Sequence, residues 1–298
     1  MYKKDAYPYP LPISRALEAA EKICVDDGSS QCHASVLRVA DALTYYMGSV
    51  AVAHYSQAYY TGQIEVDPTL NRSLRSLRRL LPGQWLGWIA RGLQAAPAGA
   101  VPGLADWYAQ VIPGAAPAYE ELRRLMVERL SYTGEYGPRQ SVSPRLLLEI
   151  IDQYRIRRAR SEPGSEDAEL DTAVSGVLLP GLREVIEAAS FLVNYPLYAP
   201  QQRQLIMGLK AATPMPPMSS PGDADATLLL YPPGEEPDYT KRPNLQVERL
   251  PLFPLDPLLV YINCVQCGKY RVAALQGVSN DRPTYLGLDP DCGHSIEL

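Results

Sequence analysis

Hydrophobic residues recur three and four positions apart through most of the first two thirds of the chain, which is the spacing of an amphipathic α-helix. The clearest case follows Ser143, which is suited to cap a helix that begins with Pro144. The apolar stripe of this helix consists of Leu146, Leu147, Ile150, Ile151 and Tyr154. Such a continuous stripe predicts a helix packed into a core. The stretch 36–52 is apolar on most faces and predicts a buried central helix.

Further segments show the same spacing and are separated by prolines and glycines, which end helices. The expected helices cover residues 13–24, 31–59, 71–81, 84–91, 105–112, 118–130 and 171–194. Pro180 is expected to interrupt or restart the last of them. Together these helices predict an all-α helical bundle over residues 1–197.

The pattern changes after residue 197. Short runs of β-forming residues alternate with turns rich in proline and glycine. The expected strands cover residues 205–209, 226–231, 245–250, 258–263, 270–275 and 284–288. The fold class is therefore predicted to be α+β, with the helical bundle followed by a small β-rich domain over residues 198–298.

Composition and charge narrow the function classes. Hydrophobic residues make up 46% of the chain and charged residues 20%, as in a folded protein. The net charge of -5 gives no global attraction to nucleic acid or membranes, so such a contact would need a local patch. The apolar stretch 42–53 falls short of the roughly 20 residues that cross a bilayer. With five cysteines and no visible targeting signal, a cytoplasmic location with reduced thiols is expected.

Four residues near the end of the chain have the spacing of a metal site. Cys264 and Cys267 are two residues apart on a predicted turn, and Cys292-Gly-His294 follows the next two strands. Three thiolates and one imidazole form a tetrahedral set for Zn²⁺, and a hairpin between the two pairs is the layout of a zinc ribbon. A site filled by four protein ligands is structural. The alternative is a set of ordinary buried cysteines.

Two groups of arginines are candidate contacts for nucleic acid or for a protein partner. The first follows the stripe that ends at Tyr154 and consists of Arg155, Arg157, Arg158 and Arg160. The second is expected on one face of helix 71–81 and consists of Arg72, Arg75 and Arg79. The alternative for the first group is a solvated helix end whose cations complement the helix dipole. The alternative for the second is a solvated helix face.

The order of helices and several short motifs resemble the bacterial HEPN-type helical domains of defence and signalling proteins. The resemblance rests on 81–85 (Leu-Pro-Gly-Gln-Trp), on 191–197 (Phe-Leu-Val-Asn-Tyr-Pro-Leu), on the tail 257–268 and on the amphipathic helix before the first arginine group. In many such domains a segment like Arg-Asn-x-x-x-His lies at this helix end, and paired copies form a metal-independent ribonuclease centre.

The chain departs from that motif at the diagnostic positions. Arg155 matches the arginine, but Ile156 takes the place of the polar residue and Arg160 that of the histidine. Arginine cannot move protons near neutral pH, because its pKa is far too high. The resemblance therefore implies a catalytically degenerate copy.

The sequence favours a non-enzymatic adaptor or scaffold subunit of a bacterial defence or signalling system, with a protein partner and no membrane contact. A homodimer is also compatible with the resemblance. One alternative is a ribonuclease in which the arginines grip phosphate near Tyr154, and another is an RNA- or DNA-binding module without cleavage. His33 and His54 are expected to have core or boundary roles.

Overall fold

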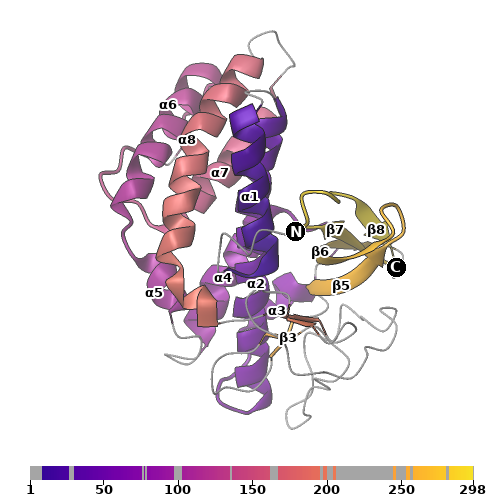
Figure 1. The fold of residues 1–298 in the computed structure, drawn as a ribbon. Helices are drawn as coiled ribbons and strands as arrows, with labels where there is room; N and C mark the ends of the chain where they lie inside the picture. Colours follow the sequence, from indigo (N-terminus) through magenta and orange to yellow (C-terminus); the bar gives the residue numbers. More distant parts are fainter. Residues whose placement is uncertain are drawn as a thin grey trace. The chain divides into compact units, whose positions relative to one another are not determined.

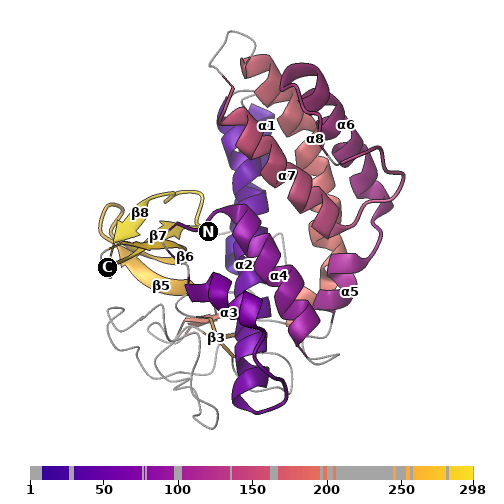
Figure 2. The same cartoon turned by 180° about the vertical axis from the view of Figure 1, so that it is seen from behind.

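The computed structural model describes residues 9–26, 30–75, 77, 79–96, 103–134, 136–161, 167–194, 197–199, 204–205, 244–245, 253–255, 258–279 and 282–297. Within these residues, eight α-helices precede two four-stranded sheets, and all strand pairs in both sheets are antiparallel (Figures 1 and 2). The predicted α+β fold class is therefore confirmed.

The helices follow the predicted order. They are α1 (Leu11–Asp26), α2 (Ser30–Tyr60), α3 (Pro68–Arg75), α4 (Pro82–Ala95), α5 (Leu104–Ala109), α6 (Ala116–Arg129), α7 (Pro144–Arg158) and α8 (Asp167–Ala188). Two short 3₁₀ helices are η1 (Pro113–Ala115) and η2 (Ser190–Asn194). Helix α8 continues through Pro180, so the predicted interruption there is wrong.

The strands form two separate sheets. One sheet has the order β2-β1-β3-β4 and consists of β1 (Leu197–Ala199), β2 (Gln204–Leu205), β3 (Asn244–Leu245) and β4 (Phe253–Pro254). The other has the order β5-β6-β7-β8 and consists of β5 (Leu259–Cys264), β6 (Lys269–Ser279), β7 (Arg282–Gly287) and β8 (Ser295–Glu297). Strands β5, β6 and β7 match the last three predicted strands. The predicted strand 226–231 lies outside the described residues, as do 206–209 and 246–250.

The chain forms two compact units. One takes its described residues from Met1–Arg15, Ala42–Val101 and Phe191–Leu298, and the other from Ala16–Asp41 and Pro102–Ser190. These segments differ from the predicted domains 1–197 and 198–298, whose limits stay a prediction.

The second unit is a helical bundle in which α6 packs against both α7 and α8 (Figures 1 and 2). Gly181 on α8 allows the close approach of α6, because a β-carbon there would lie 2.4 Å from the β-carbon of Ala118. Helix α7 begins as predicted, since the Ser143 hydroxyl accepts a hydrogen bond from the Leu146 N–H at 3.3 Å. Tyr154 and most of the apolar stripe on α7 are fully buried. This packing fixes the helix end that carries the first arginine group.

In the first unit, the segment after α3 leaves the predicted helix. The Leu80 N–H donates to Gln276 O, and the Val278 N–H donates to Leu77 O, both at 2.6 Å. The chain here pairs with β6 in place of continuing the helix to residue 81. Arg79 therefore does not share a helix face with Arg72 and Arg75, and this prediction is wrong. Arg72 and Arg79 are exposed, and the Arg75 side chain lies outside the described residues.

Cys24 and Cys32 form a disulfide, so the expectation that all thiols are reduced is wrong. The physical reason is the short connection between two helices. Helix α1 ends at Asp26 and α2 begins at Ser30, which brings the two cysteine Cα atoms to 4.8 Å.

Among the helices that the structure describes, none combines the length and the apolar character needed to cross a membrane.

Candidate metal centre and arginine cluster

The four predicted metal ligands lie together in the first unit. The Sγ atoms of Cys264, Cys267 and Cys292 and a ring nitrogen of His294 are all within 4.8 Å of one another. The distance from Cys267 Sγ to Cys292 Sγ is 3.8 Å. His294 Nδ1 lies 3.4 Å from Cys264 Sγ and 3.6 Å from Cys292 Sγ. The end of β5 supplies Cys264 and the turn before β6 supplies Cys267, while the segment between β7 and β8 supplies Cys292 and His294.

These distances match the edges of a tetrahedron around one ion. Metal–sulfur bonds of about 2.3 Å and metal–nitrogen bonds of about 2.0 Å place two sulfurs roughly 3.8 Å apart, and a sulfur and a nitrogen roughly 3.5 Å apart. The three cysteine sulfurs and Nδ1 of His294 could therefore hold a single metal ion.

Two glycines give the ligand turns their shape. Gly268 has a φ of 66° and Gly293 a φ of 54°, in the left-handed region that favours glycine. The Gly268 N–H donates to Cys264 O at 2.7 Å and closes the first turn. The Cys292 N–H donates to Asp289 O at 2.9 Å and closes the second. The backbone thus fixes the ligand positions locally, as the sequence predicts.

The thiols differ in their acidity. Burial acts to raise the pKa of Cys267, but hydrogen bonds from Arg271 and from the neighbouring thiols lower this pKa to about 6. Burial raises the pKa of Cys292 to about 11. Because the thiolate is the form that binds a metal, the lowered pKa of Cys267 favours its role as a ligand.

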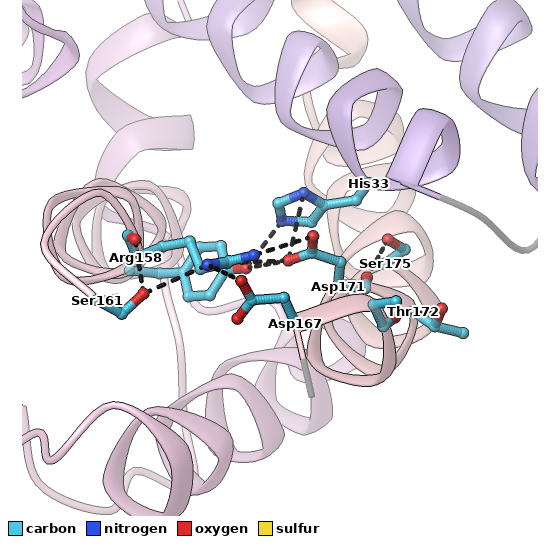
Figure 3. Close-up of polar contacts among 9 residues, drawn as sticks. His33, Arg158, Ser161, Asp167, Asp171, Thr172 and Ser175 are labelled. Carbon is cyan, nitrogen blue, oxygen red and sulfur yellow. Dashed lines mark hydrogen bonds and ion pairs between the residues drawn. The ribbon is translucent and has the colours of Figure 1, made fainter. Parts of the chain in front are cut away.

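The first arginine group is divided among internal partners in the second unit. Arg155 donates to Leu37 O at 2.6 Å and forms an ion pair with Asp41 at 2.7 Å. Arg158 lies 3.1 Å from both Asp167 and Asp171 (Figure 3). One guanidinium thus faces two carboxylates, so Arg158, Asp167 and Asp171 together carry a net charge of about -1.

The other two arginines of the group do not join these ion pairs in the described residues. The Arg157 guanidinium lies 5.4 Å from the centre of the Tyr132 ring, in a cation–π contact. Arg160 is exposed beyond the end of α7. The four arginines therefore do not form one cationic surface.

His33 on α2 lies beside Arg158 of the first arginine group, a contact that the sequence did not predict. Its Nε2 lies 2.8 Å from the Tyr154 hydroxyl, and its Nδ1 lies 3.7 Å from Asp171. The Tyr154 hydroxyl is 3.4 Å from the same carboxylate. Figure 3 shows the imidazole, Arg158 and Asp171 pointing toward one another. We call His33, Tyr154, Arg158, Asp167 and Asp171 the His33 cluster.

The environment sets the protonation of this cluster. Burial lowers the pKa of His33, and Asp171 only partly opposes this. Burial and the nearby Asp171 carboxylate raise the pKa of Tyr154 beyond its ordinary range. At neutral pH we therefore assign a hydrogen bond from the Tyr154 hydroxyl to Nε2 of a neutral His33, whose Nδ1–H faces Asp171.

This protonation predicts a pH-dependent stability. The unfolded chain takes up a proton at His33 near the ordinary pKa of 6.5, whereas the folded protein resists it. The free energy of unfolding should fall as the pH drops below about 6.5, because the unfolded state binds more protons. Denaturant unfolding of the wild type and of His33→Gln, measured from pH 8 to pH 5, checks this. We expect a shallower decline in the variant; parallel curves would contradict the assignment.

Comparison of the chain with protein-family models, with curated proteins and with solved structures finds no match. The metal centre and the His33 cluster are therefore the features that bear on function.

Proposed function

We propose that this protein is a non-enzymatic adaptor or scaffold subunit of a bacterial multi-protein defence or signalling system. One observation supports this most strongly. Arg155, which stands at the arginine position of the nuclease motif, is held by Asp41, and the neighbouring Arg158 is held by Asp167 and Asp171. An RNA phosphate would have to displace Asp41, Asp167 or Asp171 from them.

Charge also disfavours phosphate binding at the His33 cluster. Asp167 and Asp171 outnumber Arg158, and both carboxylates lie within 3.1 Å of its guanidinium. A phosphate placed there would be repelled by the second carboxylate at close range. The helix end therefore acts as an internal ion-pair network that joins α2, α7 and α8.

We propose that the metal is Zn²⁺ and that its role is structural. Three cysteines and one histidine suit zinc, and they fill all four positions of a tetrahedron. A zinc ion held in this way fixes the β5–β6 turn to the turn before β8, as in a zinc ribbon. It leaves no position for a substrate or a water, and so supplies no catalysis.

The HEPN-like sequence motifs support the assignment to a defence or signalling system and the presence of a protein partner. The helical bundle agrees with the fold that the resemblance implies, and the departures at Ile156 and Arg160 agree with a non-catalytic role. The cytoplasmic location stays a prediction. The Cys24–Cys32 disulfide does not favour it, since disulfides persist mainly in oxidising compartments.

Co-expression with the proteins encoded by neighbouring genes tests the adaptor proposal. We expect the chain to co-elute with one of them as a defined complex in size-exclusion chromatography. The complex should persist when Arg160 is replaced by alanine and after treatment with ribonuclease. A chain that stays free of every neighbouring product, or that associates only through RNA, would contradict the proposal.

A second candidate function is a ribonuclease with a non-standard centre, and His33 favours it. This histidine supplies a titratable group beside Tyr154 and Arg158, although the motif position itself holds Arg160. In this function Arg155, Arg157 and Arg160 would contact phosphate. Replacing these three arginines by alanine should then abolish RNA cleavage, and cleavage that survives the triple variant would remove this candidate.

A further inference from the structure

A pocket of about 340 Å³ lies where the start of α1 meets the β5–β6 hairpin within the first unit. Its volume is near the lower end of the roughly 300–1,000 Å³ that ligand sites occupy. Neither the His33 cluster nor the metal ligands line it. The lining residues that carry charge or an aromatic ring are Arg15, Lys269, Arg271, Asp289, Tyr261 and Tyr270.

The pocket has an excess of positive charge. Arg15, Lys269 and Arg271 supply three cations, and Asp289 supplies the only carboxylate among the lining residues. Asp289 Oδ2 accepts from Arg271 at 2.7 Å and also from Arg15, so one carboxylate oxygen serves two guanidinium groups. The carboxylate cannot neutralise all the cations around it.

Arg271 donates to Asp289 and to the Cys267 thiol, and one further donor of its guanidinium has no acceptor among the described residues. Its side chain is 7% exposed, and its buried Nε atom has no hydrogen-bond partner within the described structure. A buried donor without an acceptor is unfavourable, and a guanidinium is suited to bind the oxygens of a phosphate. This donor and the charge excess together indicate an anionic ligand.

The pocket also offers a flat aromatic surface beside these cations. The rings of Tyr261 and Tyr270 have centroids 5.6 Å apart and planes only 26° apart, so they are stacked. Tyr270 is 41% exposed. Exposed aromatic rings beside basic side chains are the means by which proteins hold the bases and phosphates of single-stranded nucleic acids. An acidic peptide would use the cations but would leave the ring face unused.

We propose that this pocket binds a nucleotide, with its base stacked on Tyr270 and its phosphate held by Arg15, Lys269 and Arg271. The nucleotide is either a free mononucleotide or one unit of a single-stranded RNA. The site is distinct from the arginine group at the end of α7, and it places the nucleotide contact beside the metal centre.

Fluorescence anisotropy with a short labelled single-stranded RNA tests the proposal on the full metal-loaded chain, and unlabelled AMP serves as competitor. We expect Tyr270→Ala to weaken binding roughly tenfold or more, while Tyr270→Phe keeps it. Lys269→Gln should reduce the slope of log affinity against log salt by about 0.7, as expected for one lost phosphate contact. Displacement by AMP supports a mononucleotide ligand; binding of RNA that AMP does not displace supports a nucleic-acid strand.

Matched controls keep this test specific. Val265→Ala changes a residue that is 87% exposed in the turn between β5 and β6. Arg160→Gln removes a cation at the end of α7. Both should leave binding unchanged. Metal content and circular dichroism confirm that each variant is folded. The proposal is overturned if neither RNA nor AMP binds, if Tyr270→Ala and Lys269→Gln bind like the wild type, or if an acidic peptide displaces RNA more strongly than AMP does.

Discussion

Replacing Cys264 with serine is expected to abolish metal binding and to unfold the β5–β8 sheet. Cys264 is buried at the end of β5, and its Sγ lies 3.4 Å from His294 Nδ1. Structural zinc contributes about 10–16 kcal/mol of apparent binding free energy in zinc-finger peptides. This binding free energy is as large as the whole free energy of unfolding of a typical domain, which is roughly 5–15 kcal/mol. A small sheet that loses its metal therefore loses its largest single stabilising interaction.

Metal analysis and hydrogen exchange check this result. The wild type should contain about one zinc per chain, and Cys264→Ser should contain none. Backbone amides of β5 to β8 should lose their protection in the variant. The double variant Cys24→Ser/Cys32→Ser removes two cysteines of the other unit and serves as the control, because it should keep its metal. Metal retained in Cys264→Ser, or unchanged protection in the sheet, would refute the structural role of the site.

Replacing Asp171 with alanine is expected to lower stability by about 3 kcal/mol. Asp171 is 8% exposed and pairs with Arg158 at 3.1 Å, so the change leaves a partly buried cation without its main acceptor. Breaking a buried ion pair in this way costs about 3–5 kcal/mol. The lower end applies here because Asp167 still contacts Arg158. For a protein of this size, the melting temperature should fall by roughly 6–12 °C.

Thermal unfolding at pH 7.5 measures this effect. Glu169→Ala is a matched control, since it removes an exposed carboxylate from the same turn of α8 and should change stability by less than about 0.5 kcal/mol. Asp171→Asn should lie between the two, because an amide oxygen can still accept a hydrogen bond from Arg158. If Asp171→Ala unfolds at the same temperature as Glu169→Ala, the His33 cluster does not stabilise the bundle.

Features that depend on neighbouring residues could be predicted from the sequence. The cap of α7 needs only Ser143 and the amides that follow it, and its buried face follows from helical spacing. The metal ligands fall in two short turns, each closed by its own backbone hydrogen bond and shaped by Gly268 or Gly293. Local spacing therefore carried enough information for both.

Features that depend on distant contacts could not be predicted. His33 and Tyr154 are 121 residues apart, and only the packing of α2 against α7 brings them together. The end of α3 is set by pairing with β6, about 200 residues further along the chain. One signal for the cluster was present: Asp171 lies seven residues before Leu178, and so on the buried face of α8. A carboxylate in such a position needs a cation, and this points to Arg158.

Cleavage of a labelled single-stranded RNA by excess purified protein tests the central claim most directly, because the claim is that the His33 cluster is a structural network in an adaptor. The assay compares the metal-loaded wild type with His33→Gln between pH 5 and pH 9. We predict that neither protein cleaves RNA faster than buffer alone at any pH. Cleavage by the wild type that is lost in His33→Gln would contradict the account and establish a ribonuclease.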